Sequence, residues 1–175
     1  LFSDPGKLMK MIGKVGKSLD EKLKSGEIKE SELMEEASEF LKKMNDVPGM
    51  KNMSSMFRDT PSLTSLDLSG FNASSVEDFT YMFSGTSGLT NINLSVVATN
   101  SAKDLSFMFK DNVNLTSLNL NNLFNTSSVN YMTGMFQGAS NLVNLDLSNL
   151  DTTYVLSMAS MLEGTTSLSN LTLPV

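Results

Sequence analysis

The chain has 175 residues, with 13 basic and 19 acidic side chains, a formal net charge of −6, and neither His nor Cys. The acidic excess disfavours nucleic acid as a partner, and the missing Cys and His exclude disulfides, Cys/His zinc sites, thiolate nucleophiles and imidazole bases. No apolar run approaches the roughly 20 residues that span a bilayer. We therefore expect no enzymatic activity, no metal and no cofactor.

The first part of the chain is rich in charge and has helical periodicity. Ser3-Asp4-Pro5 is typical of a helix start, and Gly26 of a helix end. Ser31 can cap a second helix that ends before Val47-Pro48. The apolar stripes of the two helices comprise Leu8, Ile12, Val15, Leu19 and Leu23, and then Leu33, Met34, Ala37, Phe40, Leu41 and Met44. We predict that residues 1–47 form a helical hairpin that caps the rest of the chain.

Two other functions of this segment were considered. The first helix carries Lys side chains at helical spacing and could lie on an anionic membrane or dock on a partner, but such residues are usually the solvated face of a helix. These residues are Lys7, Lys10, Lys14 and Lys17. Gly26, Ile28 and Glu32 suggest an EF-hand, yet its first and third loop positions would be Glu21 and Leu23. Those residues do not fit the motif, so calcium binding is not expected.

A repeat of about 26 residues occupies residues 48–175. Each copy contains a Met-Phe pair, and the pairs begin at Met56, Met82, Met108, Met135 and, as the degenerate Met-Leu, Met161. An L-x-x-L-x-L motif follows each pair: Leu63/Leu66/Leu68, Leu89/Ile92/Leu94, Leu115/Leu118/Leu120, Leu142/Leu145/Leu147 and Leu168/Leu171/Leu173. Two residues after each pair stands a residue that tolerates left-handed backbone, namely Asp59, Gly85, Asp111, Gly138 or Gly164.

The apolar spacing within one repeat changes from helical to extended. Val76, Phe79 and Met82-Phe83 fall on one face of a helix, whereas Leu66 and Leu68 alternate with polar neighbours as in a strand. A single unit of this kind buries its apolar side only by stacking on its neighbours. We therefore predict an α/β solenoid, a leucine-rich repeat with about five 26-residue coils, each a short helix plus a short parallel strand, behind the N-terminal helical hairpin. The Met and Phe columns are predicted to be core.

The pattern V-x-D-F-x-Y-M-F-x-G-x-x-x-L-x-x-L-x-L-S from Val76 to Ser95 resembles the BspA-like leucine-rich repeats of bacterial surface proteins and lipoproteins. The resemblance covers about residues 48–175. It implies an adhesion or interaction module at a cell surface or outside the cell, with a virus particle as the alternative location. The chain lacks the Cys that often follows the Met-Phe pair in such repeats; that column holds Thr60, Thr86, Asn112, Ala139 and Thr165.

The outward side of the predicted strands is the candidate binding surface. Its Ser, Asn, Asp and Thr side chains form an array of hydrogen-bond donors and acceptors suited to sugar hydroxyls or to the backbone of a protein partner. The candidate residues are Ser65, Asp67, Asn91, Asn93, Ser117, Asn119, Asn144, Asp146, Asn170 and Thr172. The alternative is that they are only the solvated face of the sheet. Asp67 and Asp146 lie three coils apart, roughly 14 Å at ~4.8 Å per coil, too far for a glycosidase pair.

The C-terminal end is the second candidate surface. The sequence stops at Leu173-Pro174-Val175 with no capping helix, so we expect that further residues follow in the native protein or that another chain covers this end. The sequence thus favours a noncatalytic module that binds a protein or glycan partner through its strand face. The alternative is a structural assembly protein of a cell surface or virus particle. It would dock on neighbouring subunits through its C-terminal end or its first helix, with self-association as one outcome.

Overall fold

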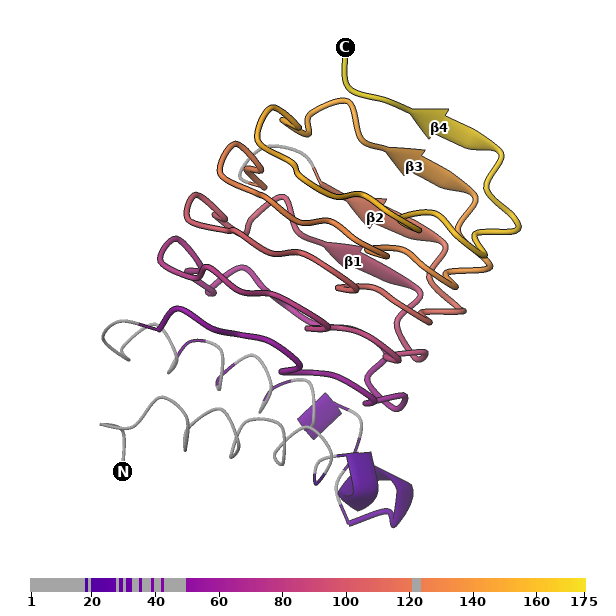
Figure 1. Ribbon diagram of the computed structural model, residues 1–175. Coiled ribbons are helices and arrows are strands. Elements are labelled where there is room, and N and C mark those ends of the chain that lie inside the picture. Colours follow the sequence, from indigo (N-terminus) through magenta and orange to yellow (C-terminus); the bar gives the residue numbers. More distant parts are fainter. Residues whose placement is uncertain are drawn as a thin grey trace.

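The computed structural model describes residues 18, 20–27, 29, 31–32, 35, 39, 42, 50–120 and 124–175. The sequence repeats are stacked in chain order, with residues 20–24 near one end and the C-terminal repeat at the other (Figure 1). Because each repeat lies on the next one along the chain, side chains 26 or 27 positions apart become neighbours.

Four three-residue strands lie on one side of the stack: β1 (Asn91–Asn93), β2 (Ser117–Asn119), β3 (Asn144–Asp146) and β4 (Asn170–Thr172). They form two parallel pairs, β1 with β2 and β3 with β4. The register joins equivalent residues of adjacent repeats, such as Asn91 with Ser117 and Asn144 with Asn170. The strands therefore match the L-x-L segments of the sequence, as predicted, but only as separate pairs.

A second ladder runs through all five repeats on another side of the stack. Single parallel bridges join Asn52 to Asp78, Asp78 to Asp104, Asp104 to Tyr131 and Tyr131 to Ser157. Each bridge leads into the segment that carries the Met-Phe pair, and further backbone hydrogen bonds continue along that segment. This ladder was not predicted from the sequence, yet it is the connection that links every repeat to the next.

The predicted fold class is wrong. The expected helix around the Met-Phe pair is a run of turns, because Tyr81 and Phe107 have φ values of 57° and 58°, which no α-helix permits. The N–H groups of Tyr81 and Phe83 donate to the next repeat instead of to their own turn. The described residues contain no helix of seven residues or more and only short parallel strand pairs, so the predicted α/β solenoid is not seen.

The helical hairpin cap is also not seen in the described part of residues 1–47. There, the longest continuous helical stretch covers residues 20–24 and ends through Gly26, whose φ is 74°. Of the rest of the predicted hairpin, only residues 18, 29, 31–32, 35, 39 and 42 are described, and its Lys face falls outside the described residues. Oδ1 of Asp20 accepts a hydrogen bond from the N–H of Ser62 at 2.9 Å, so this short helix contacts the first repeat.

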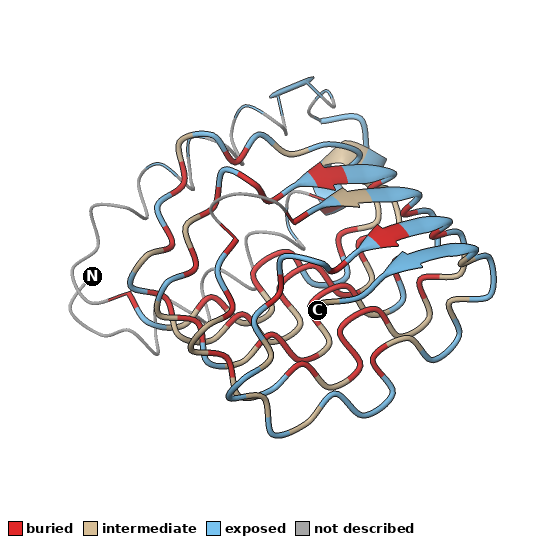
Figure 2. Cartoon of the chain, turned by 90° about the horizontal axis from the view of Figure 1, so that it is seen from above, coloured by how far each residue is buried: buried red, intermediate tan, exposed pale blue. Residues whose placement is uncertain are grey.

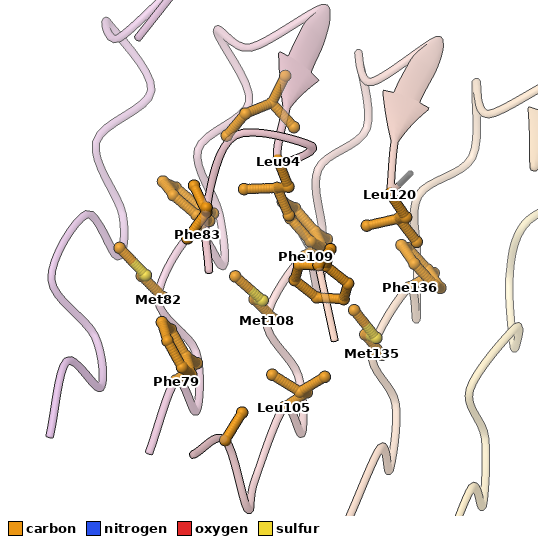
Figure 3. Close-up of a cluster of buried hydrophobic side chains, with 14 of the residues drawn as sticks. Phe79, Met82, Phe83, Leu94, Leu105, Met108, Phe109, Leu120, Met135 and Phe136 are labelled. Atoms are coloured by element: carbon orange, nitrogen blue, oxygen red, sulfur yellow. The ribbon is translucent and has the colours of Figure 1, made fainter. Parts of the chain in front are cut away.

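The apolar columns of the repeat form the core between the two ladders (Figure 3). Met82, Met108 and Met135 are 1% exposed or less, which confirms that the Met column is core. The Phe rings beside them stack face to face, with centroids 5.5–5.8 Å apart, from Phe57 to Phe136. The left-handed column was also predicted correctly, with φ between 55° and 75° at Asp59, Gly85, Asp111, Gly138 and Gly164.

Among the described residues, no helix has the length and apolar character needed to cross a membrane. In the same part of the chain, no group of three or more acidic side chains is arranged so that it could hold a metal ion.

Candidate functional site

The first and third residues of β1 to β4 form an exposed polar surface, which we call the strand face (Figure 2). The middle residues of β1 and β3, Ile92 and Leu145, are buried at 4% and 2% exposure, whereas Leu171 in β4 is 40% exposed. Parallel pairing of β1 with β2 and of β3 with β4 places equivalent residues side by side, and we group the exposed positions of the four strands into two columns. The first column holds Asn91, Ser117, Asn144 and Asn170, and the second holds Asn93, Asn119, Asp146 and Thr172. Ser65 and Asp67 are exposed in the first repeat, where no strand forms.

The second column stabilises the turns that follow the strands. Oδ1 of Asp146 accepts a hydrogen bond from the N–H of Ser148 at 2.9 Å, and Oδ1 of Asp67 accepts one from the N–H of Ser69 at 2.9 Å. Oδ1 of Asn93 accepts hydrogen bonds from both the N–H and the Oγ–H of Ser95, at 3.0 and 2.6 Å. These are Asx turns, in which a short side chain replaces a backbone acceptor. Their oxygens are therefore partly used within the fold.

The same hydrogen bonds shift the pKa values of the two acidic residues of this surface, Asp67 and Asp146. Bonds from the backbone N–H and the hydroxyl of Ser69 lower the pKa of Asp67. The hydroxyl and the backbone N–H of Ser148 lower the pKa of Asp146. A general acid needs the opposite shift. The two carboxylates also lie in the first and fourth repeats, so the structure does not bring them together as a catalytic pair.

The first column has a different character, because two of its side chains are joined to each other across adjacent repeats. Nδ2 of Asn170 donates to Oδ1 of Asn144 at 2.6 Å, linking β4 to β3. Nδ2 of Asn91 makes only a long bond of 3.4 Å to Oγ1 of Thr90. An exposed amide in such a row retains donor and acceptor capacity that a partner can use. The first column is thus the better-suited half of the predicted site.

An aromatic cluster on the other ladder was missed by the sequence analysis. The rings of Tyr81 and Phe107 stack with centroids 4.8 Å apart, and the guanidinium carbon of Arg58 lies 4.7 Å from the Tyr81 centroid. Gly134 comes next in this column, and a Cβ there would lie 2.4 Å from Cε1 of Phe107. The residue before each Met-Phe pair is the sequence signal for this cluster. Both rings are half-buried, so they support the wall of the stack more than they form a platform.

The C-terminal repeat ends in an apolar groove with a volume of about 560 Å³. Its lining includes Leu147, Leu150, Met158, Met161, Leu162 and Leu173. The equivalent residues Met53, Phe79, Leu105 and Met132 of earlier repeats are at most 1% exposed, whereas Met158 is 47% exposed. The groove is therefore the side of the core that a following repeat would cover.

Comparison with known proteins gives one match. A family model described as "Mycoplasma protein of unknown function, DUF285" matches residues 26–121 and, in an overlapping alignment, residues 51–173. The chain belongs to this family. The two alignments start 25 residues apart, which is about one repeat. The search of curated proteins and the search of solved structures give no match.

Proposed function

We propose that this DUF285 protein is a noncatalytic binding module whose strand face contacts a protein or a glycan. The observation that carries the proposal is the first column, in which Asn91 is in register with Ser117 and Asn144 with Asn170, each pair one parallel step of ~4.8 Å apart. A row of neutral amides and hydroxyls matches sugar hydroxyls or peptide groups without requiring a charged partner. The resemblance to BspA-like repeats supports a location at a cell surface or outside the cell.

The composition of the strand face also suggests how strong such binding would be. No aromatic side chain lies in either column, and aromatic residues supply most hot spots in protein interfaces and most stacking on sugars. The contribution of each repeat is therefore small, and affinity would grow with the number of repeats that contact the ligand at once. A ligand with its own short period, such as an oligosaccharide or an extended peptide, fits this arrangement.

The experiment is a screen of the full chain on arrays of defined glycans and of purified proteins, followed by titration of each hit. The triple variant Asn91→Ala, Asn144→Ala and Asn170→Ala should weaken binding at least about tenfold, since each lost hydrogen bond is worth about 0.5–1.5 kcal/mol. Asn100→Ala is the matched control, because Asn100 is an exposed Asn outside the strand face. Equal loss in both variants, or no loss in the triple variant, would reject the strand face as the binding surface.

A second candidate function is assembly, which the exposed apolar groove of the C-terminal repeat favours. In this alternative the protein is a structural subunit of a cell surface or a virus particle that docks on its neighbours through that end. Light scattering over a concentration series tests it, because a chain that does not self-associate stays at 19.0 kDa. The alternative in which the first helix docks on a partner or a membrane concerns residues outside the described part of the chain.

A further inference from the structure

The second ladder brings an aromatic ring beside a carboxylate on the outside of the stack, between the third and fourth repeats. A parallel bridge pairs Asp104 with Tyr131, and the N–H of Tyr131 donates to the carbonyl of Lys103 at 3.2 Å. Paired residues of adjacent parallel segments place their side chains on the same side, about 4.8 Å apart. Val129 and Met132 are fully buried, whereas Tyr131 is 43% exposed. The ring therefore belongs to the outer surface of the ladder and not to the core.

The exposure of Tyr131 does not depend on where the stack ends. Its bridge partners are Asp104 in the preceding repeat and Ser157 in the following one, so the ring has a repeat on either side. Among the described residues, Tyr131 takes part in no ring–ring or cation–π contact, whereas Tyr81 in the same ladder stacks on Phe107. The ring of Tyr131 is thus accessible from the side of the stack.

The carboxylate of Asp104 keeps an unused acceptor beside this ring. Its Oδ1 accepts a hydrogen bond from the N–H of Ser106 at 2.8 Å, and its Oδ2 has no hydrogen-bond partner in the described part of the chain. One repeat earlier, both oxygens of Asp78 are occupied. Its Oδ2 accepts from Nδ2 of Asn52 at 2.7 Å, and its Oδ1 from the N–H of Thr80 at 2.9 Å. Asp104 can therefore accept a bond from a partner, whereas Asp78 is used by the fold.

The charges around this pair favour a cationic partner. From residue 111 to residue 175 the sequence contains neither Lys nor Arg, but four acidic residues: Asp111, Asp146, Asp151 and Glu163. Among the described residues, Asp104 forms no ion pair with the cations nearest to it in the sequence, and Nζ of Lys110 lies 3.6 Å from Oδ2 of Asp111 instead. The side of the stack that follows Asp104 thus has only negative charge, which complements a basic partner.

Lys103 does not neutralise this site, because its charge acts on the preceding repeat. The pKa of Glu77 is lowered first by its hydrogen bond with Lys51, and the charge of Lys103 lowers it further. The N–H of Lys103 also donates to the carbonyl of Glu77 at 2.8 Å. Lys103 therefore belongs to a row of alternating charges with Lys51 and Glu77, next to the row that contains Asp104.

The same side of the stack already contains the interaction that a cation would make with Tyr131 and Asp104. The guanidinium carbon of Arg58 lies 4.7 Å from the ring centroid of Tyr81, and Nε of Arg58 lies 3.4 Å from Oδ2 of Asp59. One guanidinium thus contacts a tyrosine ring and a carboxylate at once, which suits its planar shape and its fork of donors. Tyr131 and Asp104 provide the same two groups from adjacent repeats, but the chain provides no arginine there.

We propose that Tyr131 and Asp104 form a docking site for an arginine-bearing segment of a protein partner. The guanidinium of the partner lies on the ring of Tyr131 and donates to Oδ2 of Asp104. Tyr and Arg are enriched among interface hot spots, and the strand face contains no aromatic side chain. The inference goes beyond the proposed function, because this site lies on the second ladder and does not require a ligand at the strand face.

The test titrates the full chain with the peptide acetyl-Ser-Arg-Ser-Arg-Ser-Arg-amide at physiological salt and follows the binding by NMR. The chain has three Tyr and no Trp, so few ring signals need to be assigned. We expect the ring signals of Tyr131 and the amide signal of Asp104 to shift with saturation. The peptide with Lys in place of Arg should bind more weakly, because an ammonium group has no planar face and no fork of donors.

Four substitutions locate the site. Tyr131→Ser introduces the residue that its bridge partner Ser157 already has, and it should weaken binding at least about threefold, whereas Tyr131→Phe keeps the ring and should retain binding. Asp104→Asn keeps the acceptor for Ser106, removes the charge and should also weaken binding. Asp146→Asn is the matched control, because it removes the same charge from the strand face and should leave binding unchanged. Circular dichroism checks that each variant folds.

Three results would overturn the proposal. One is binding that survives Tyr131→Ser, and another is the absence of any shift at Tyr131 with millimolar peptide. The third is equal weakening by Asp104→Asn and Asp146→Asn, which would mean only that a basic peptide is attracted to an acidic protein.

Two further arms separate this site from other binding. Maltohexaose and chitohexaose test a neutral glycan on the same ring, and a shift at Tyr131 with either sugar but not with the Arg peptide would contradict a protein partner. The triple Asn variant of the strand face should bind the Arg peptide as the parent chain does. Failure of the docking site therefore leaves the proposed function standing, and loss of peptide binding in the triple variant would place the peptide on the strand face and reject the site at Tyr131.

Discussion

Asp20 and Ser62 are joined by a hydrogen bond of 2.9 Å across 42 positions of the sequence. Asp20 is 6% exposed, and its Oδ2 also pairs with Nζ of Lys24 at 2.5 Å. Burial raises the pKa of Asp20, but the hydrogen bonds from Lys24 and Ser62 outweigh this effect and hold the pKa below its usual value. This carboxylate attaches the short helix to the first repeat.

The first prediction concerns Asp20→Asn, which keeps an acceptor for Ser62 but loses the charge. Because the folded-state pKa is lowered, the charge contributes stability above the ordinary Asp pKa of about 3.9, and this contribution is lost as the pH falls through the folded value. Urea unfolding should show the variant less stable at pH 7 and close to the parent chain at pH 2. A difference that is the same at both pH values would mean that the charge is not responsible.

The second prediction concerns Asn112, a fully buried side chain whose Oδ1 and Nδ2 have no partner among the described residues. In the same column, Oγ1 of Thr86 donates to the carbonyls of Phe83 and Phe57. Asn112→Thr should therefore raise the free energy of unfolding by about 1–3 kcal/mol, the cost of unsatisfied buried groups. The reciprocal Thr86→Asn should lower it by a similar amount, and a loss of stability in Asn112→Thr would contradict this account.

The third prediction concerns the stack of aromatic rings formed by Phe57, Phe83, Phe109 and Phe136. In the last repeat the equivalent position is occupied by Leu162, so the stack has no fifth ring. Leu162→Phe should add a fifth ring on the open side and stabilise the chain by about 0.5–1.5 kcal/mol. Phe109→Ala, in the middle of the stack, should cost about 3–5 kcal/mol. Thermal and urea unfolding measure both. No gain in Leu162→Phe would show that a ring needs a neighbour on each side to contribute.

The fourth prediction separates the turn role of the second strand-face column from a binding role. Asp146→Asn keeps the acceptor for the N–H of Ser148, as Asn93 does in its own repeat, so the melting temperature should barely change. Asp146→Ala removes the acceptor and should lower it. If ligand binding falls in Asp146→Asn while the melting temperature is retained, the carboxylate itself contacts the ligand and the first column is not sufficient.

The fifth prediction concerns the close backbone contact between the first two repeats at Gly88. A Cβ at this position would lie 2.3 Å from the carbonyl oxygen of Pro61 and 2.6 Å from that of Leu63. Neither backbone atom can move without separating the repeats, so Gly88→Ala should destabilise the chain by about 1–3 kcal/mol. Asn141→Ala, at the equivalent exposed position of the fourth repeat, is the control and should have a much smaller effect on urea unfolding.

The strand face shows which features of the candidate site could be predicted from the sequence alone. The L-x-L alternation placed Asn91 and Asn93 on the outside correctly, because side chains alternate along any extended segment. The alternation did not distinguish the two columns. Only the turn after the strand, where Ser95 donates to Asn93, shows that one column is used by the fold. The groove could likewise be recognised only from the way the last repeat packs on the one before it, because both repeats line it.

The sequence by itself determined the period, the buried Met and Phe columns and the left-handed positions after each Met-Phe pair, because these depend on side-chain type and local backbone preference. Only the tertiary structure decided that the segment around Met82-Phe83 is a run of turns and not a helix. Apolar spacing of three and four residues is common to both, and the choice is made by hydrogen bonds to a repeat 26 residues away. Those hydrogen bonds form only when the repeats are stacked, so side-chain spacing within one repeat cannot reveal them.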